Sequence, residues 1–333
     1  MRKFLNDGNT YVDEMLDGLC AANPDFYNRL GDSGRVMARA ICPVVGKVGI
    51  VTGGGSGHLP VFHGYIGHGL LDACAVGNVF AGPRMHDCLA AMRAANGSAG
   101  VLQLYGNYGG DRMNFEMSKD LAELEGIEVT TVRLSDDVAS APPESRELRR
   151  GVAGMVYAFK IAGAKAEQRA SLAEVTSVAK KAADACRSIG VALTPCIVPE
   201  VGNAAFEISD GEVEFGMGIH GEPGIWRGKM KSADELAAEM LDRLFSELHT
   251  TPGDRMSVLV NSLGATPLEE LYILYRKVDQ MLRQKRITPV MPLIGRFATS
   301  MEMAGASITL LPLDVELESL LKAPASSPFW NVL

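Results

Sequence analysis

His220 is the side chain of this sequence most plainly placed for chemistry, because it stands among glycines in the segment that runs from Gly216 to Gly224. Glycines beside a histidine remove the Cβ atoms that would keep another molecule from the ring. A neutral imidazole nitrogen that is reached in this way is a nucleophile or a base. The structural alternative is a glycine-rich bend in which His220 only caps a neighbouring element.

The residues before His220 predict a β-hairpin. Apolar and polar residues alternate from Phe206 to Phe215 on both sides of a central Asp210-Gly211 pair, which is typical of two strands joined by a type I′ turn. We therefore expect a rigid hairpin to deliver His220.

A second histidine follows a second glycine cluster. The β-branched run that ends at Thr52 predicts a strand, and Gly53-Gly54-Gly55-Ser56-Gly57-His58 then predicts a turn at the carboxyl edge of a parallel sheet. The cluster lacks the lysine of a nucleotide P-loop, and its spacing does not fit G-x-G-x-x-G. A ligand-binding turn and a plain chain reversal both remain open.

Asp111 closes a third cluster. A predicted strand over residues 100–105 leads into Gly106-Asn107-Tyr108-Gly109-Gly110-Asp111, and a helical pattern follows. Asp is a preferred N-cap residue, and it is also a common general base when its carboxylate faces a cleft. Both roles are expected alternatives for Asp111.

Composition sets limits on the class of protein. The chain has 333 residues, of which 47% are apolar and 22% charged, with a net charge of −8. These values are typical of a globular protein and argue against nucleic-acid binding. Without a run of about 18 apolar residues or a signal-peptide pattern, we expect a cytoplasmic protein that does not bind a membrane.

Cysteine and histidine spacing gives little sign of a metal site. The six cysteines form no C-x-x-C pair and are expected to be reduced thiols. His58, His63 and His68 recur every five residues, which is poor spacing for one helical face, and no cysteine or carboxylate cluster accompanies them. We therefore expect no metal ligands in this chain.

The elements alternate between strand-like and helix-like patterns, which predicts an α/β fold with two domains, each a sheet flanked by helices, over residues 1–186 and 187–333. Capping boxes at Ser171/Glu174 and Ser232/Glu235 predict helix starts. The first of these helices is expected to end at Gly190. A C-terminal tail that carries Phe329 and Trp330 is expected to pack on the first domain.

Together these motifs resemble the substrate-binding subunit of the dihydroxyacetone kinases. The likeness covers essentially the whole chain, in motifs that follow the family's order: Phe4–Asp7 with Val12–Gly18, Gly53–His58, Asn107–Asp111 with Asn114-Phe115, Asp136–Val138, Arg150–Gly154 with Lys160–Ala164, Gly216–Gly224, Asn261–Pro267 and Thr299–Gly305.

The resemblance implies a covalent mechanism. In the family, the histidine that corresponds to His220 adds to the ketone carbon of a short sugar and holds it as a hemiaminal. Asp111 and His58 would hydrogen-bond the terminal hydroxyl that receives phosphate, with Asp111 as its base and His58 assisting or sharing that role. The main chain of Gly55, Ser56 and Gly57 would hold the sugar, and the site would lie between the two domains.

Two positions depart from the family pattern. Leu59 stands where the family commonly has glutamate, and Gly106 stands where it commonly has lysine before Asn-Tyr. Loss of the lysine removes a cation near the substrate hydroxyls, and the glycine is expected to leave open space. A larger ketose such as erythrulose is therefore an alternative substrate.

The resemblance also implies partners. The sequence shows no Walker A lysine and no kinase glycine-rich loop with its lysine, so no cofactor is expected on this chain. ADP or ATP with Mg²⁺ would be carried by a separate helical kinase subunit, and the chain itself would form a homodimer. Three functions follow as alternatives: a dihydroxyacetone kinase subunit, the same chemistry on another ketose, or a ketose sensor without enzyme activity.

Overall fold

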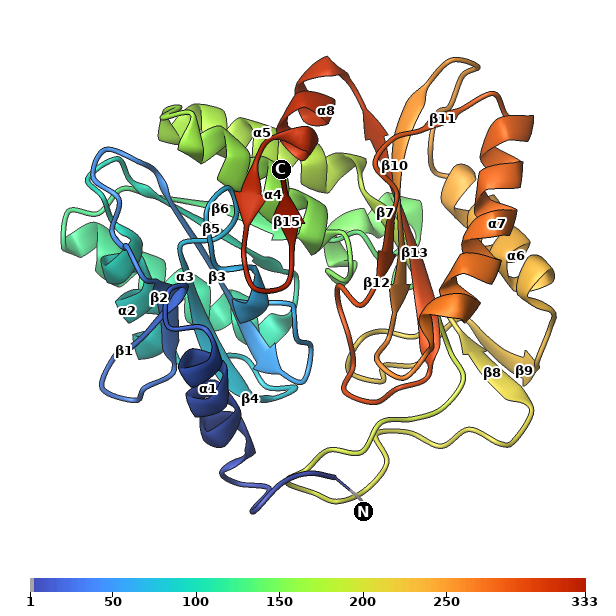
Figure 1. Cartoon of the computed structure of the whole chain (residues 1–333), viewed down its shortest axis with the longest axis horizontal. Coiled ribbons are helices and arrows are strands. Elements are labelled where there is room, and N and C mark those ends of the chain that lie inside the picture. Colours follow the sequence, from blue (N-terminus) through green and yellow to red (C-terminus); the bar gives the residue numbers. More distant parts are fainter. Residues whose placement is uncertain (1–2) are drawn as a thin grey trace.

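The first sheet is built around parallel strands, and the chain enters the last two of them through crossover helices (Figure 1). The structure is a computed structural model that describes residues 3–333. The strand order of this sheet is β1-β2-β4-β3-β5-β6. Strands β4, β3, β5 and β6 run parallel, and β1 and β2 add an antiparallel edge. The strands are β1 (Tyr27–Leu30), β2 (Val36–Arg39), β3 (Gly49–Ser56), β4 (Ala73–Val79), β5 (Val101–Gly106) and β6 (Val129–Leu134).

The second sheet is mixed and has the order β11-β10-β13-β7-β8-β9, with β12 also paired to β10. Its long strands β10 and β13 pair antiparallel along their whole length. The strands are β7 (Arg187–Ala192), β8 (Glu212–Phe215), β9 (Trp226–Lys229), β10 (Arg255–Ser262), β11 (Thr288–Pro289), β12 (Leu293–Gly295) and β13 (Gly305–Leu313).

Helices lie on both sides of each sheet and between the two sheets (Figure 1). Successive residues of β3 point to opposite faces of the first sheet: Ile50 and its neighbour Val51 belong to different apolar cores. This strand is therefore buried on both faces. The helices are α1 (Tyr11–Ala22), α2 (Met85–Ala95), α3 (Gly109–Leu124), α4 (Met155–Glu167), α5 (Leu172–Ala185), α6 (Ala233–Phe245), α7 (Leu268–Gln284) and α8 (Val315–Lys322).

One apolar core joins the sheets. Helices α4 and α5 pack on the first sheet, and the same core contains Leu259 and Leu311 of the second sheet. The neighbouring residues Val258 and Leu310 instead face the core under α6 and α7. The order of layers is therefore α2 and α3, first sheet, α4 and α5, second sheet, α6 and α7. This shared core fixes the position of one sheet relative to the other.

Buried polar contacts strengthen the same junction. The Arg149 guanidinium, which is fully buried, donates to both carboxylate oxygens of Glu247, at 2.5 and 2.7 Å. The Lys160 ammonium donates to the Leu320 carbonyl at 2.7 Å. Removal of one partner of a buried charge pair leaves an uncompensated charge, so these contacts oppose separation of the two sheets.

The last residues fold back onto the first sheet's side of the molecule. Strands β14 (Ala325–Ser326) and β15 (Asn331–Val332) form a short hairpin, and the Ser326 N–H donates to the His68 carbonyl at 2.9 Å. Trp330 is buried and meets the Tyr65 ring edge to face. The tail therefore covers the segment that follows β3. Among residues 3–333, no helix has the length and apolar character that crossing a membrane requires.

Local signals predicted helix starts better than helix ends. Both capping boxes are present as predicted, with the side chain of each serine accepting from the N3 backbone. The predicted helix end at Gly190 is wrong, because α5 ends at Ala185 and Gly190 lies inside the fully buried strand β7. Burial at the centre of a sheet outweighs the glycine signal.

The hairpin predicted before His220 is also wrong in its pairing. Gly211 does form a turn with positive φ, but residues 206–209 form no strand. Strand β8 pairs instead with β9, which follows His220 in the chain. Phe215 and Trp226 stack at the end of this pair, with ring centroids 5.2 Å apart. His220 therefore lies in the loop that joins β8 to β9.

Candidate functional site

The candidate site lies at the carboxyl ends of the parallel strands of the first sheet, where α/β proteins bind ligands. His58 follows β3, Phe80 follows β4, and Tyr108 and Asp111 follow β5. The β8–β9 loop of the second sheet adds His220 to this group. The structure thus brings together all three side chains that the sequence singled out for chemistry.

His58 is a buried, neutral imidazole with a defined orientation. Its Nδ1 lies 2.7 Å from the Thr299 carbonyl oxygen, so Nδ1 donates and Nε2 carries the lone pair. Nε2 has no partner among residues 3–333. Burial, and then the nearby His220, lower the pKa of His58 to about 3. Its Nε2 is therefore available as a hydrogen-bond acceptor.

The His220 ring is surrounded by aromatic rings. Its centroid lies 4.8 Å from that of His58, 4.7 Å from that of Tyr108 and 5.4 Å from that of Phe80. The side chain keeps 20% exposure, so it can be reached from outside. A partly exposed imidazole with aromatic walls is suited to the binding of a small polar compound.

Glu222 orients His220, and sequence reasoning missed it. Its Oε1 lies 2.9 Å from His220 Nδ1, and its Oε2 accepts from the His220 backbone N–H, also at 2.9 Å. Burial alone would raise the pKa of Glu222, but the hydrogen bond and charge of His220 and the charge of Arg150 lower it to about 2. An ionised carboxylate at Nδ1 leaves the lone pair on Nε2, which makes Nε2 the nucleophilic atom.

A short chain of charges holds Glu222. Arg150 lies 3.8 Å from its Oε2 and also contacts the Asp137 carboxylate at 2.8 Å. The signal for Glu222 was present in the sequence, since it stands two residues after His220 in the same glycine-rich segment. Its role depends on the loop geometry, which that pattern does not contain.

Asp111 is a buried carboxyl group in the first turn of α3. The N-cap of this helix is Tyr108, so the expectation of an Asp111 N-cap is wrong. Asp111 is 7% exposed, and its Oδ1 has no hydrogen-bond partner among residues 3–333. Burial raises the pKa of Asp111 to about 7, against the opposing charge of His220. A pKa near neutrality suits a group that must take up and release a proton.

The glycines before His58 serve close packing. The predicted turn at Gly53 is wrong, because β3 continues to Ser56. A Cβ at Gly55 would lie 2.7 Å from the Ala81 nitrogen, and one at Gly57, where φ is +100°, would lie 2.8 Å from the Phe80 ring. The Ser56 hydroxyl donates to the Gly77 carbonyl at 2.9 Å. These residues allow Phe80 to stack under His58, with centroids 5.1 Å apart.

The two departures from the family pattern lie in different surroundings. A Cβ at Gly106 would lie 3.2 Å from both the Met155 sulfur and the Tyr108 ring, so the expectation of open space there is wrong at the Cβ position. Leu59 lines a separate cavity of about 540 Å³, together with Arg296 and Thr299. A side chain at position 106 would therefore change the surroundings of His220 by displacing Tyr108, whose ring packs on that of His220.

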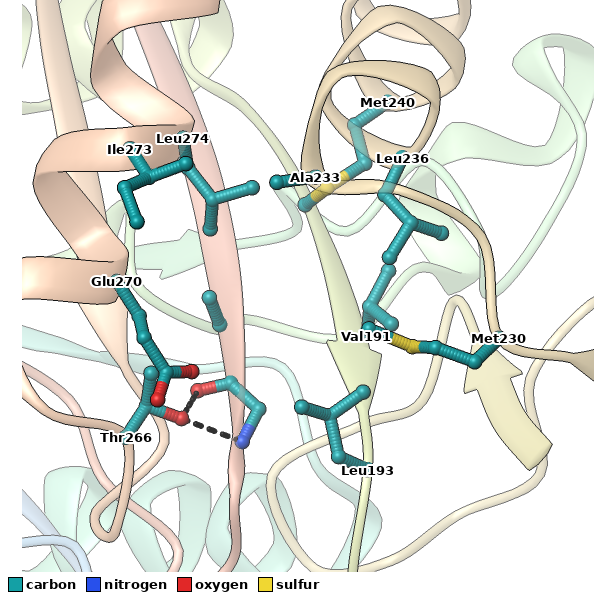
Figure 2. A pocket seen from close by; sticks show the side chains of 12 residues that line it. Val191, Leu193, Met230, Ala233, Leu236, Met240, Thr266, Glu270, Ile273 and Leu274 are labelled. Atoms are coloured by element: carbon teal, nitrogen blue, oxygen red, sulfur yellow. Dashed lines mark hydrogen bonds between the residues drawn. The ribbon is translucent and has the colours of Figure 1, made fainter. Parts of the chain in front are cut away.

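A second, apolar pocket lies between α6, α7 and the second sheet (Figure 2). Its walls include Leu236, Met240 and Leu274, and the Thr266 hydroxyl donates to the Gly305 carbonyl. Glu270 is the one titratable side chain at its mouth. The Thr266 hydroxyl is held by both main-chain groups of Gly305, because it donates to the carbonyl and accepts from the N–H. The group around His220 is therefore the stronger candidate for chemistry.

The sequence matches the Dak1 domain over residues 17–329. It is 42% identical over 332 residues to the dihydroxyacetone-binding subunit DhaK of PTS-dependent dihydroxyacetone kinase 2 from Listeria innocua, with 100% of each chain covered. It is 41% identical over 331 residues to the D-erythrulose kinase of Mycolicibacterium smegmatis. That alignment covers 99% of this chain and 57% of the relative.

Solved structures agree in fold. The dihydroxyacetone kinase of C. freundii superposes with a TM-score of 0.91 at 33% identity, over 99% of this chain and 60% of that chain. The dihydroxyacetone kinase operon co-activator Dha-DhaQ superposes with a TM-score of 0.88 at 31% identity, over 95% of this chain and 97% of that chain. The chain thus spans about 60% of the C. freundii kinase and nearly all of the co-activator.

Proposed function

Because the chain belongs to the dihydroxyacetone kinase family, we propose that it is the sugar-binding catalytic subunit of a dihydroxyacetone-type kinase. The observation that carries this proposal is the His220–Glu222 hydrogen bond of 2.9 Å, which leaves His220 Nε2 with a lone pair. The His58 ring lies 4.8 Å from the His220 ring, and the charge of His220 acts on Asp111. Asp111 adds support for an enzyme, because a buried carboxyl group whose pKa is raised to about 7 can take up and release a proton.

The proposed first step is covalent capture of the ketose. His220 Nε2 forms a bond to the carbonyl carbon, and the carbonyl oxygen takes up a proton from solvent. Glu222 passes the Nδ1 proton on to solvent and stays ionised, so the adduct is a neutral hemiaminal. Main-chain groups from Gly55 to Gly57 and the rim at Gly106 are the proposed contacts to the sugar. The adduct fixes the terminal hydroxyl in position for reaction.

The proposed second step is phosphoryl transfer. The terminal hydroxyl lies between Asp111 and His58 Nε2, and Asp111 accepts its proton as the oxygen attacks phosphorus. The donor is a nucleotide that a separate helical subunit carries with Mg²⁺. Some relatives are longer than this chain: in the C. freundii kinase, the matching region is about 60% of a single longer polypeptide. The proposed assembly is a homodimer of this chain with that partner.

Erythrulose is a second candidate substrate. Gly106 replaces a family lysine, and two Mycolicibacterium smegmatis relatives at 41% and 39% identity are erythrulose kinases. A ketose sensor is the third candidate, and the likeness to the co-activator Dha-DhaQ supports it.

A mixing assay tests these candidates. The chain is combined with a nucleotide-bearing kinase subunit, and phosphate ester formation is measured with dihydroxyacetone and with erythrulose. Turnover of either ketose supports the kinase, whereas tight ketose binding with no turnover supports the sensor. High-resolution density for the soaked ketose tests the covalent step: a planar ketone at van der Waals distance from His220 would contradict it.

A further inference from the structure

Helix α3 begins beside Asp111 with main-chain N–H groups that are not satisfied. The first hydrogen bond at this end runs from the Arg112 N–H to the Tyr108 carbonyl at 2.9 Å. The N–H groups of Gly109, Gly110 and Asp111 have no partner among residues 3–333, and Tyr108 supplies no side-chain cap. Such a helix start carries partial positive charge directed along the helix axis.

The fold does not explain the two glycines at this start. A Cβ at Gly109 or Gly110 would meet nothing within 4 Å, and neither residue has a left-handed φ. Alanine stabilises a helix by roughly 1 kcal/mol relative to glycine, so the helix itself would gain from a side chain at either position. Close approach of another molecule to the backbone accounts for glycine at both.

Asp111 supplies an independent sign of a ligand at the same place. Its side chain is more than nine-tenths buried, yet Oδ1 has no partner among residues 3–333. Gly82, which is exposed, lies in front of this atom, because a Cβ at Gly82 would be 2.7 Å from Oδ1. An exposed glycine, Gly82, therefore borders the unsatisfied carboxyl oxygen, and the exposed Gly109 and Gly110 directly precede Asp111 in the chain.

We propose that the first turn of α3 is the subsite for the phosphoryl group during transfer, with the N–H groups of Gly109 and Gly110 as donors to its oxygens. This inference rests on the proposed kinase function and names the place where the donor phosphate lies. The ketose hydroxyl oxygen bonds to phosphorus, and its proton goes to Asp111. The bond from phosphorus to the nucleoside diphosphate breaks, and its electron pair leaves with that diphosphate.

The charges of this arrangement are compatible. Once Asp111 has accepted the hydroxyl proton, it is neutral and does not repel the new phosphate ester. Its pKa near 7 allows this state at neutral pH. Arg112, in the same helical turn, is exposed and has no ion-pair partner in the part of the chain that the structure describes, so it adds positive charge at this end. An anionic group is therefore stabilised where the reaction delivers it.

Inorganic phosphate is the probe for the chain alone. The ¹⁵N-glycine-labelled protein is titrated with phosphate, and the Gly109 and Gly110 amide resonances are expected to shift. Gly109→Pro removes one N–H at the first helical position, which tolerates proline, after a residue that is already extended. We expect it to weaken phosphate binding at least about fivefold, the loss of one charge-assisted hydrogen bond.

Two further variants keep this test decisive. Val315→Pro makes the same backbone change at the exposed first residue of α8, and phosphate affinity is expected to stay within twofold. Gly110→Val keeps its N–H but blocks approach, and it is expected to weaken phosphate binding as well. The inference is overturned if the two glycine resonances do not respond to phosphate, or if Gly109→Pro and Gly110→Val both bind phosphate as the parent protein does.

Turnover with the nucleotide-bearing subunit separates this inference from the function on which it rests. We expect Gly109→Pro to lower kcat about 10- to 100-fold, while the ketose dissociation constant stays within twofold. If the parent protein turns over and Gly109→Pro has an unchanged kcat, the subsite is wrong and the kinase stands. If the parent protein does not turn over, the kinase function is wrong, and the phosphate titration still decides whether this anion site exists.

Discussion

The rings of His58 and His220 meet edge to face, with centroids 4.8 Å apart and planes at 76°. The two residues come from different sheets, so this contact exists only while the shared core holds the sheets in place. Burial and the nearby His220 lower the pKa of His58 to about 3, so its ring is neutral and its Nε2 lone pair is free for a hydrogen bond. Glu222 occupies Nδ1 of His220, which leaves Nε2 of that ring for bond formation.

The His220–Glu222 hydrogen bond gives the first prediction. Glu222→Ala removes the acceptor at Nδ1, so the lone pair of a neutral His220 is no longer fixed on Nε2. A hydrogen bond to a charged group contributes about 1.5–3 kcal/mol, so ketose affinity is expected to fall roughly 10- to 150-fold. Isothermal titration measures it. Glu200→Gln, an exposed position remote from this hydrogen bond, is the control and should bind normally; equal affinity in Glu222→Ala would leave Glu222 without a role in capture.

Asp111 gives a prediction about pH. Because its pKa is raised to about 7, the carboxylate form needed for proton acceptance is lost as pH falls below that value. We expect kcat/KM to drop about tenfold for each pH unit below 7 and to level off above it. His58, with a pKa of about 3, stays neutral throughout this range. A pH profile of kcat/KM with both ketoses checks this, and an acid limb centred near pH 5 would exclude Asp111 as its source.

Asp111→Asn should separate activity from stability. Loss of a general base costs about 10²–10⁴ in rate, while ketose binding is expected to remain. In the parent protein the raised pKa means that stability falls as pH rises from about 4 to about 7, because the folded state retains a proton that the unfolded state loses.

The asparagine variant has no carboxyl group to ionise there. Its free energy of unfolding is therefore expected to exceed that of the parent protein by about 1–4 kcal/mol at pH 8, and by much less at pH 4. Denaturant unfolding at both pH values measures the difference. Asp120→Asn, an exposed change in the same helix, should alter neither rate nor stability; an Asp111→Asn protein with parental turnover would show that this carboxyl group is structural.

The sequence signals that singled out His58, Asp111 and His220 as candidates are local. His58, Asp111 and His220 each follow a strand and stand beside glycines, and a strand end with glycines is recognisable without the rest of the fold. The capping boxes at Ser171 and Ser232 were predictable for the same reason.

What the sequence did not predict depends on contacts between distant segments. Strand β8 pairs with β9 across the His220 loop, and the nearby alternation over residues 206–209 gave no sign of that choice. The Glu222 interaction with Arg150 and the approach of Phe80 to Gly55 likewise need the assembled sheets. Gly106 was predicted to leave space because the position of Tyr108 could not be known.

Gly106 gives the last prediction, which concerns substrate choice. Since a Cβ at this position would lie 3.2 Å from the Tyr108 ring and from the Met155 sulfur, Gly106→Ala must displace one of them. Tyr108 packs edge to face on His220 at 4.7 Å, so its displacement would disturb capture of every ketose. Overpacking costs typically about 1–3 kcal/mol, and kcat/KM for both dihydroxyacetone and erythrulose is expected to fall.

A lysine at position 106 would add a cation at the cost of the same displacement. In Gly106→Lys we expect kcat/KM to fall more for erythrulose than for dihydroxyacetone, because the long side chain occupies the volume that an additional hydroxymethyl group needs. Met155→Ala combined with Gly106→Lys makes room for the new Cβ and should recover dihydroxyacetone turnover while erythrulose turnover stays low. Side-by-side kcat/KM values for the two ketoses in the four proteins decide the matter: an unchanged ratio throughout would show that position 106 does not select the substrate.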